Sequence, residues 1–348
     1  MGGILPSLLH WAVALVPVLL LLAVFVWLDA FALMNLREIL LLLLLGGASA
    51  ILVYPISGRL IDTLPIGFSG YSRFVAPWLE EASKGIFMIV LFWFNRIGYK
   101  LDAVISGFAI GAGFSVVENI IYLTIFPQYG MGTWLVRGVG TAVMHGTTLA
   151  ILAAIAHEFA ERETRDAAGE FDFNLLWFLP GYLTAVLLHV AFNQFPDRPV
   201  IAMMGAALFA PVAIMAIFHF GTAEAQNWLA AEIAAHQSQV DVLKAGNWPE
   251  GRSGERISSL AERLPAESAI RIRRYWELQA WLVLQAEEAI QQESVGDAQI
   301  DKDQVRAAFA ELDGLKRALG KSSFTALKAL LPFSRNDYWE LSELRQRL

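Results

Sequence analysis

The chain has 348 residues, 56% of them hydrophobic, and a mean hydropathy of +0.49. Soluble domains are usually about 45–50% apolar, so this composition favours a membrane protein. The net charge of −7 is spread along the chain and gives no indication of nucleic-acid binding. Cysteine is absent from the sequence, which excludes disulfides, thiolate metal ligands and a cysteine nucleophile.

Apolar segments of membrane-crossing length follow one another from the N-terminus, and roughly 20 apolar residues suffice to cross a bilayer. The N-terminus lacks a positively charged region, so we expect the first segment to be a retained span and not a signal peptide. We predict an all-α fold, a polytopic membrane helix bundle of about seven spans. They cover about residues 4–27, 39–55, 77–97, 103–126, 134–155, 175–195 and 200–220.

The third segment differs from the others because it begins with charged residues. It contains the stretch APWLEEASKGIFMIVLFWFN, in which Glu80 and Glu81 precede the apolar run. The two glutamates could have a purely structural role. Acidic residues are favourable at the start of a helix, and Lys84 lies four residues after Glu80, a spacing that allows an ion pair. Adjacent residues on a helix point about 100° apart, so we expect only one of the two glutamates to face water. The sequence does not decide which one.

Further polar side chains lie inside the next three spans, where ionisable residues are costly and usually mark function. Each has a structural alternative, because a buried histidine or glutamate can be a hydrogen-bonded core residue. Their common depth favours function, since all lie in the half of the bilayer where the third span begins. His189 and Asn193 also share a helix face. The residues are Glu118, Asn119, His145, His189 and Asn193.

After Gly221 charged residues occur throughout, and stretches such as DKDQVRAAFAELDGLKRALG have amphipathic helical spacing. We therefore predict two domains, a membrane domain of residues 1–221 and a soluble helical C-terminal region of residues 222–348. The C-terminal region is expected to pack or to bind a protein partner. The placement of Lys and Arg favours a cytoplasmic C-terminal region and an N-terminus on the outer side.

The motifs EEASK, FSVVEN, an isolated histidine within a span, and HVAFN resemble those of the PrsW family, in the same order and on successive spans. These are polytopic bacterial glutamic-type intramembrane proteases, related to type II CAAX prenyl endopeptidases and Abi proteins. The CAAX enzymes generally have histidine at the position of Glu118, so the resemblance favours the PrsW branch. It covers residues 77–193 and leaves the C-terminal region without a role.

The resemblance implies that Glu80 or Glu81 activates water with help from Glu118. It also implies that His189 and Asn193 stabilise the oxyanion, and we expect His145 to support them. The substrate would be a membrane-anchored protein, such as an anti-sigma factor cleaved on its outer side. The implied location is a bacterial inner membrane, with the lipid bilayer and the substrate as partners and no nucleic acid.

The expected activity is therefore that of a peptidase that needs no cofactor. Zinc is an alternative, because histidines and a carboxylate can bind it, although the sequence has no compact zinc-ligand motif. Two other classes of function fit the same residues. One is a proton-coupled transporter, in which Glu and His relay protons. The other is a non-enzymatic membrane scaffold that acts through its C-terminal region.

Overall fold

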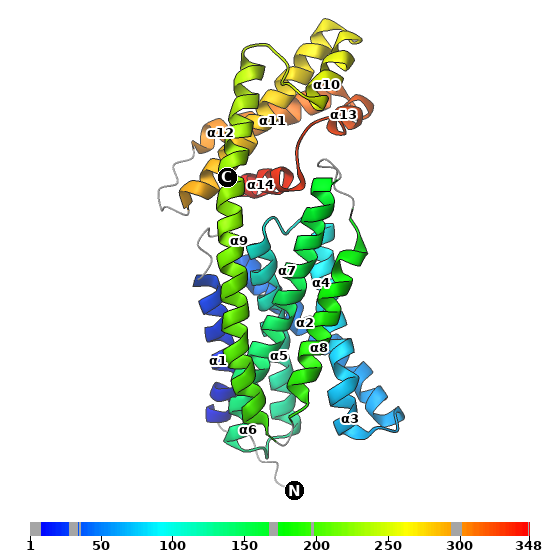
Figure 1. The fold of residues 1–348 in the computed structure, drawn as a ribbon, viewed down its shortest axis with the longest axis vertical. Helices are drawn as coiled ribbons and strands as arrows, with labels where there is room; N and C mark the ends of the chain where they lie inside the picture. The colour runs from blue at the N-terminus through cyan, green and yellow to red at the C-terminus, as the bar shows by residue number, and fades with distance from the viewer. Residues whose placement is uncertain are drawn as a thin grey trace. The chain divides into compact units, whose positions relative to one another are not determined.

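The computed structural model of the chain describes residues 8–27, 34, 36–166, 173–195, 198–293, 301–346 and 348. These residues form helices, turns and loops and contain no strand, which confirms the predicted all-α fold (Figure 1). The chain divides into two compact units. The first comprises Met1–Glu163 and Asp172–Thr222, and the second comprises Thr164–Phe171 and Ala223–Leu348. Whether they are domains that fold independently stays a prediction.

The first unit is a bundle of helices with two irregular turns. Its elements are α1 (Leu8–Trp27), α2 (Leu36–Thr63), α3 (Gly67–Phe74), α4 (Ala76–Trp93), α5 (Lys100–Ile125), α6 (Met131–Leu135), the π-helical turn η1 (Val136–Thr141), α7 (Ala142–Asp166), the 3₁₀ turn η2 (Leu175–Trp177), α8 (Phe178–Asn193) and the first part of α9 (Pro199–Lys244).

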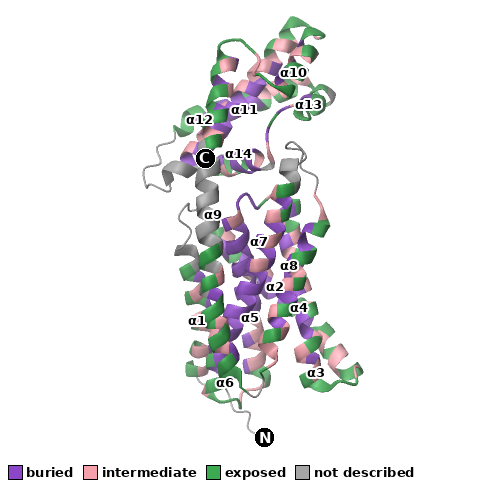
Figure 2. Ribbon diagram, viewed as in Figure 1, coloured by how far each residue is buried: buried purple, intermediate pink, exposed green. Residues whose placement is uncertain are grey.

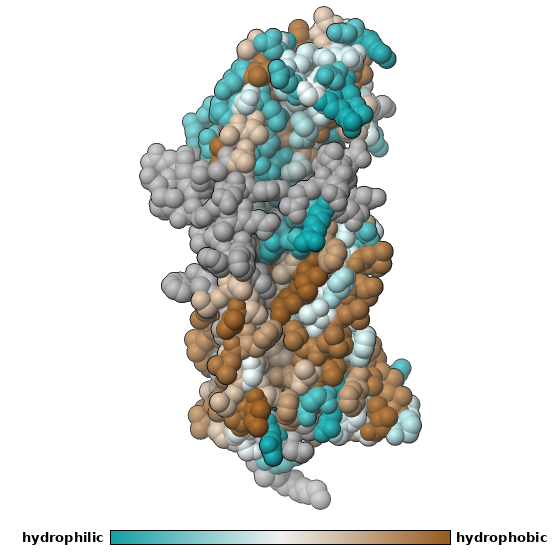
Figure 3. All heavy atoms as spheres, viewed as in Figure 1, coloured by the Kyte–Doolittle hydropathy of each residue, from teal (hydrophilic) through white to brown (hydrophobic). Residues whose placement is uncertain are grey.

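Several of these helices are suited to a bilayer. Within the described residues, four segments are long and apolar enough to cross a membrane, namely Leu36–Thr63, Lys100–Ile125, Met131–Arg162 and Leu175–Asn193. The apolar helices Leu8–Val24 and Pro199–Ala210 are shorter. Hydrophobic residues dominate the visible surface of this unit (Figure 3). The prediction of a membrane helix bundle is therefore confirmed, whereas the count of seven spans stays a prediction.

Three helices extend beyond the predicted spans or stop short of them. The second helix continues through Pro55 to Thr63, since membrane helices tolerate proline. The third ends at Trp93, and nearby Asn95 has a φ of 52°, a left-handed conformation typical of helix ends. The last does not stop near Gly221, because α9 runs on to Lys244 through residues of high helix propensity such as Ala, Glu and Gln.

Helix α5 forms the core of the first unit and is buried over most of its length (Figure 2). It packs against α1, α2 and α4. Gly107 and Gly111 face α7 so closely that a Cβ atom at either position would meet the backbone carbonyl of Leu149 or His145. These glycines therefore allow α7 to approach α5, and the approach brings His145 next to the polar residues of α5.

The second unit contains the last part of α9 together with α10 (Arg252–Glu262), α11 (Ala266–Glu293), α12 (Lys302–Leu319), α13 (Lys321–Lys328) and α14 (Arg335–Gln346). Its core lies around α11, where Trp276 and Val283 are buried. The amphipathic spacing correctly predicted α12. This helix is capped at its start by the Asp301 side chain and ends before Gly320, whose φ is 76°.

Candidate functional site

The two adjacent glutamates of α4 have different surroundings. Glu81 is fully buried, and its Oε1 lies 2.8 Å from Lys84 Nζ and 2.8 Å from His189 Nδ1. The Glu80 side chain is 14% exposed and lines a cavity. Lys84 pairs with Glu81 and not with Glu80, contrary to the pairing suggested by sequence spacing. The reason is that Lys84 and Glu81 both point into the bundle, whereas Glu80 points to the cavity.

Lys84 connects this pair to α7, because its Nζ lies 2.9 Å from Nδ1 of His145. An ammonium group can only donate, so this nitrogen of His145 accepts. Nε2 of the imidazole then carries the hydrogen, and it lies 3.3 Å from Glu118 Oε2. The position of Lys84 thus selects the tautomer in which His145 donates to Glu118.

Arg137 was missed by the sequence analysis and completes the row of charged groups. Its Nη2 lies 2.9 Å from Glu118 Oε2, and its guanidinium carbon lies 3.6 Å from the centre of the Tyr122 ring. Its Nε donates to Asn119 Oδ1 at 3.1 Å. Arg137 belongs to η1, and π-helical turns are frequent at functional sites. A signal existed, since Arg137 is the one Lys, Arg, Asp or Glu between residues 134 and 155.

The two predicted residues of α8 have different partners. His189 donates from Nδ1 to Glu81, and its Nε2 lies 3.7 Å from Glu80 Oε2. The rings of His189 and His145 stand perpendicular, with their centres 5.0 Å apart. Asn193 borders the cavity, and its Nδ2 donates to the backbone oxygen of Ser72 at 2.8 Å. Asn193 therefore links α8 to α3.

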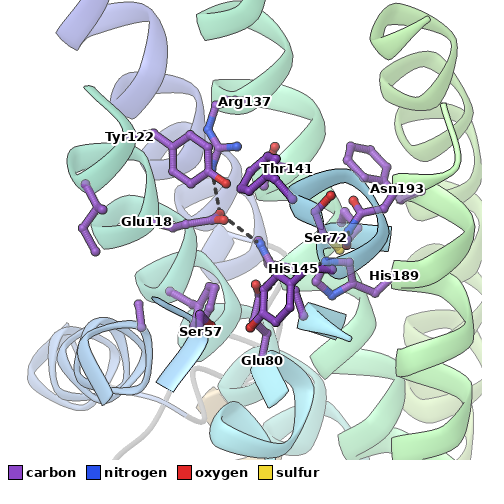
Figure 4. Close-up of a pocket in the computed structure, with 18 of the residues that line it drawn as sticks. Ser57, Ser72, Glu80, Glu118, Tyr122, Arg137, Thr141, His145, His189 and Asn193 are labelled. Atoms are coloured by element: carbon purple, nitrogen blue, oxygen red, sulfur yellow. Dashed lines mark hydrogen bonds and ion pairs between the residues drawn. The ribbon is translucent and has the colours of Figure 1, made fainter. Parts of the chain in front are cut away.

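One cavity of about 670 Å³ collects most of these side chains. Figure 4 shows Arg137, Glu118 and His145 joined in a row by an ion pair and a hydrogen bond, with Glu80, His189 and Asn193 nearby. Aromatic and aliphatic side chains form much of the remaining wall. The polar residues of the lining are Tyr54, Ser57, Tyr71, Ser72, Glu80, Glu118, Tyr122, Tyr129, Thr133, Arg137, Thr141, His145, His189 and Asn193; Glu81 is not part of it.

The carboxylates of the site differ in their cationic partners. Glu81 is paired with Lys84 and Glu118 with Arg137. Among the described residues, Glu80 has no Lys or Arg at ion-pair distance and only His189 as a possible cationic neighbour. Because the other two negative charges are already neutralised, Glu80 is the carboxylate best able to take up or release a proton in the cavity.

A metal ion could also be held here. Glu80, His145 and His189 each offer one ligand atom, and these atoms lie within 4.8 Å of one another. Two histidines and one glutamate form a frequent donor set of catalytic zinc sites. The contact between His189 and Glu81 resembles the carboxylate–histidine pairs that orient metal ligands. The donor set therefore fits a divalent metal, provided that the His145 ring nitrogen facing the ion carries no hydrogen.

Comparison with known proteins gives one match. The profile described as PrsW family intramembrane metalloprotease matches residues 16–220, more than half of the chain. No curated protein and no solved structure matches the chain. The matched segment contains every residue of the cavity lining, and the helices are apolar enough for a membrane. The chain therefore belongs to the PrsW family of intramembrane proteases.

Proposed function

We propose that this protein is an endopeptidase that hydrolyses a peptide bond of a membrane-anchored protein in the cavity of the first unit. Family membership supports peptidase activity. The observation that carries the proposal is that Glu80, Glu118, His145 and His189, from four different helices, line one cavity. Peptide hydrolysis needs a base for water and donors for the carbonyl oxygen, and this lining provides both.

Glu80 is the proposed general base. It borders the cavity and lacks a Lys or Arg partner within the described residues, so its carboxylate can accept a proton from water. The water oxygen then bonds to the peptide carbonyl carbon. As the C–N bond breaks, the proton on Glu80 moves to the leaving amine, and Glu80 returns to its starting state.

The other residues hold the site in place and stabilise negative charge. Glu81 accepts from His189 Nδ1, and a doubly protonated His189 can donate to the carbonyl oxygen from Nε2. Asn193 uses one amide hydrogen for Ser72 and has a second for substrate. Glu118, paired with Arg137, fixes the ring of His145.

A metal-assisted version of the same hydrolysis is the second candidate, and the cluster of Glu80, His145 and His189 favours it. A divalent metal held by these three residues would polarise the peptide carbonyl and the attacking water. Glu80 would then be a ligand, and Glu118 would be the carboxylate left to accept the proton from water.

The orientation of the protein remains part of the proposal. We expect the C-terminal region to be cytoplasmic, the cavity to open toward the outer side of a bacterial inner membrane, and the C-terminal region to contact a protein partner. Reporter fusions at the C-terminus and in the loop between α2 and α3 would test the orientation. An outward C-terminus would turn the cavity toward cytoplasmic substrates.

The first test is Glu80→Gln, which keeps the size of the side chain and removes its basicity. We expect cleavage of a single-span substrate in liposomes to fall by about 10²–10⁴-fold. Glu158→Gln is the matched control, because Glu158 pairs with Lys100 and Arg162 outside the cavity, and it should retain activity. Undiminished cleavage by a correctly inserted Glu80→Gln protein would refute the proposal.

The second test distinguishes hydrolysis without a metal, hydrolysis assisted by a metal, and proton transport. Chelator treatment followed by zinc addition should leave cleavage unchanged in the glutamate version, and should abolish and then restore it in the metal version. A transporter would move protons across the liposome membrane and cleave nothing, even as wild type. That result would replace the peptidase proposal altogether.

A further inference from the structure

A second cluster of buried ionisable residues lies within the second unit, outside the segment that matches the family. His236 of α9, Glu287 of α11 and Asp337 of α14 are each at most 5% exposed. The three residues are far apart in sequence, and folding of this unit brings them together. The function proposed above does not use them.

The imidazole of His236 lies between the two carboxylates. Nδ1 donates to Glu287 Oε1 at 2.8 Å, and Nε2 lies 3.8 Å from Asp337 Oδ2. The ring of Phe333 stacks on the imidazole, with the centres 6.1 Å apart and an interplanar angle of 18°. If His236 is neutral with its hydrogen on Nδ1, the lone pair of Nε2 points toward a carboxylate. The Nε2 lone pair and the Asp337 carboxylate then repel each other, and a positive charge between them would remove this repulsion.

Among the residues that the structure describes, no Lys or Arg balances the carboxylates of this cluster, because neither Glu287 nor Asp337 forms an ion pair with one. Two buried oxygens, Glu287 Oε2 and Asp337 Oδ1, have no hydrogen-bond partner in this part of the chain. Even with His236 protonated, two ionised carboxylates would leave one uncompensated negative charge, and burial of such a charge is costly.

The pKa values of the three groups reflect the same excess of buried negative charge. Burial raises the pKa of the Glu287 carboxyl and of the Asp337 carboxyl above their usual values. Burial opposes protonation of His236, but its hydrogen bond to Glu287 and the charge of Asp337 outweigh this and raise its pKa. All three groups therefore bind a proton more tightly than they would in water.

We propose that His236, Glu287 and Asp337 form a structural binding site for a divalent transition metal, with zinc as the best-fitting ion. Each residue offers one ligand atom, and these atoms lie within 4.8 Å of one another. Zinc binds imidazole nitrogen and carboxylate oxygen together, whereas magnesium and calcium prefer oxygen alone. Such an ion would cross-link α9, α11 and α14.

A simpler role accounts for only part of the cluster. Asp337 also stabilises the start of α14, because the backbone nitrogen of Ser334 donates to Asp337 Oδ2 at 2.6 Å. This contact satisfies Oδ2 and leaves Asp337 Oδ1 and Glu287 Oε2 without partners. Helix capping thus explains the position of Asp337 but not its burial beside Glu287.

The test measures zinc in the full-length protein purified in detergent. Because the first unit has its own candidate metal cluster, the parent protein carries Glu80→Gln and His189→Gln. After zinc loading and gel filtration, we expect the parent to retain about one zinc per chain by mass spectrometry. Adding His236→Gln should abolish retention. Equal retention with and without His236→Gln, or no retention by the parent, would overturn the proposal.

Two further measurements keep the result interpretable if His236→Gln folds poorly. Both use the parent protein alone. Zinc at about 100 times Kd should raise the temperature of unfolding by at least about 5 °C. Bound cobalt should show visible absorption bands of nitrogen and oxygen coordination. A parent that retains zinc but shows neither effect binds it elsewhere, which also overturns the proposal.

Discussion

The two units both bury carboxylates, but they neutralise them differently. In the first unit, Glu81 is paired with Lys84 and Glu118 with Arg137, so the chain provides its own cations. In the second unit, Glu287 and Asp337 have only His236 as an ion-pair partner among the described residues. Glu287, Asp337 and Glu81 are all almost completely buried.

The kind of cation that neutralises a buried carboxylate bears on what the carboxylate can do. Where Lys and Arg neutralise two carboxylates, a third one, Glu80, is left beside the cavity and can exchange protons with water. Where no Lys or Arg is present, the carboxylates need protons or an external cation. The first arrangement suits chemistry on a substrate, and the second suits a bound ion that stabilises a fold.

After Glu80→Gln, the largest effect on activity is expected from Glu118→Gln, which removes the charge that holds Arg137 and His145. We expect turnover to fall by about 10²–10³-fold, comparable to the loss of one group that stabilises the transition state. The assay is cleavage of a single-span substrate in liposomes with insertion measured in parallel. If Glu118 were only a hydrogen-bonded structural residue, the amide would replace it and cleavage would remain near wild type.

Lys84→Met should give the largest loss of stability. Lys84 and Glu81 are both fully buried, and removal of one partner of a buried pair costs about 3–5 kcal/mol. Unfolding in detergent micelles measures the loss. Lys100→Met is the matched control, because Lys100 and its partner Glu158 are 20% and 31% exposed, and partly exposed pairs contribute about 1 kcal/mol or less.

A double variant sharpens this result. Glu81→Gln combined with Lys84→Met removes both charges, so the unpaired carboxylate of the single variant no longer exists. We expect the double variant to regain more than half of the stability lost in Lys84→Met, without regaining activity. A double variant as unstable as the sum of both single variants would show that Lys84 stabilises the bundle by packing and not by its charge.

A smaller effect is expected from Gly111→Ala, which tests how the backbone positions the site. The added methyl group would meet the backbone of His145 in α7, and such overpacking costs about 1–3 kcal/mol. Unfolding measurements and the cleavage assay should both change, because His145 would move away from α5. Gly205→Ala has open space around its Cβ and should leave both measurements unchanged.

The smallest effect concerns the surface of the second unit. Arg274→Met removes ion pairs with Glu311 and Glu277. Arg274 is 41% exposed and the two glutamates are 45% and 16% exposed, so we expect a loss of about 1 kcal/mol. The hydrogen bond from Arg274 lowers the pKa of Glu311. The ion pair therefore contributes to the free energy of unfolding above the ordinary pKa of Glu, and this contribution is lost as pH falls through the lowered pKa. Unfolding at a pH below the lowered pKa of Glu311 should therefore no longer distinguish the variant from wild type.

The amino-acid pattern was enough to predict the fold class and most of the polar residues within the spans. Apolar runs of sufficient length indicate membrane helices, and a polar residue within such a run is costly enough to be noticed. Glu118, His145 and His189 were found in this way. Arg137 carries the same signal, but it lies near the start of its span and was passed over.

How these side chains meet depends on helix packing, which the sequence pattern does not reveal. Sequence spacing gives the angle between Glu80 and Glu81, but packing sets how α4 is rotated, and this rotation turns Glu80 to the cavity and Glu81 to Lys84. The row from Lys84 through His145 to Glu118 and Arg137 likewise depends on the close approach of α5 and α7. The cluster around His236 left no sequence signal, because single polar residues on amphipathic helices look the same whether they face water or, as here, a neighbouring helix.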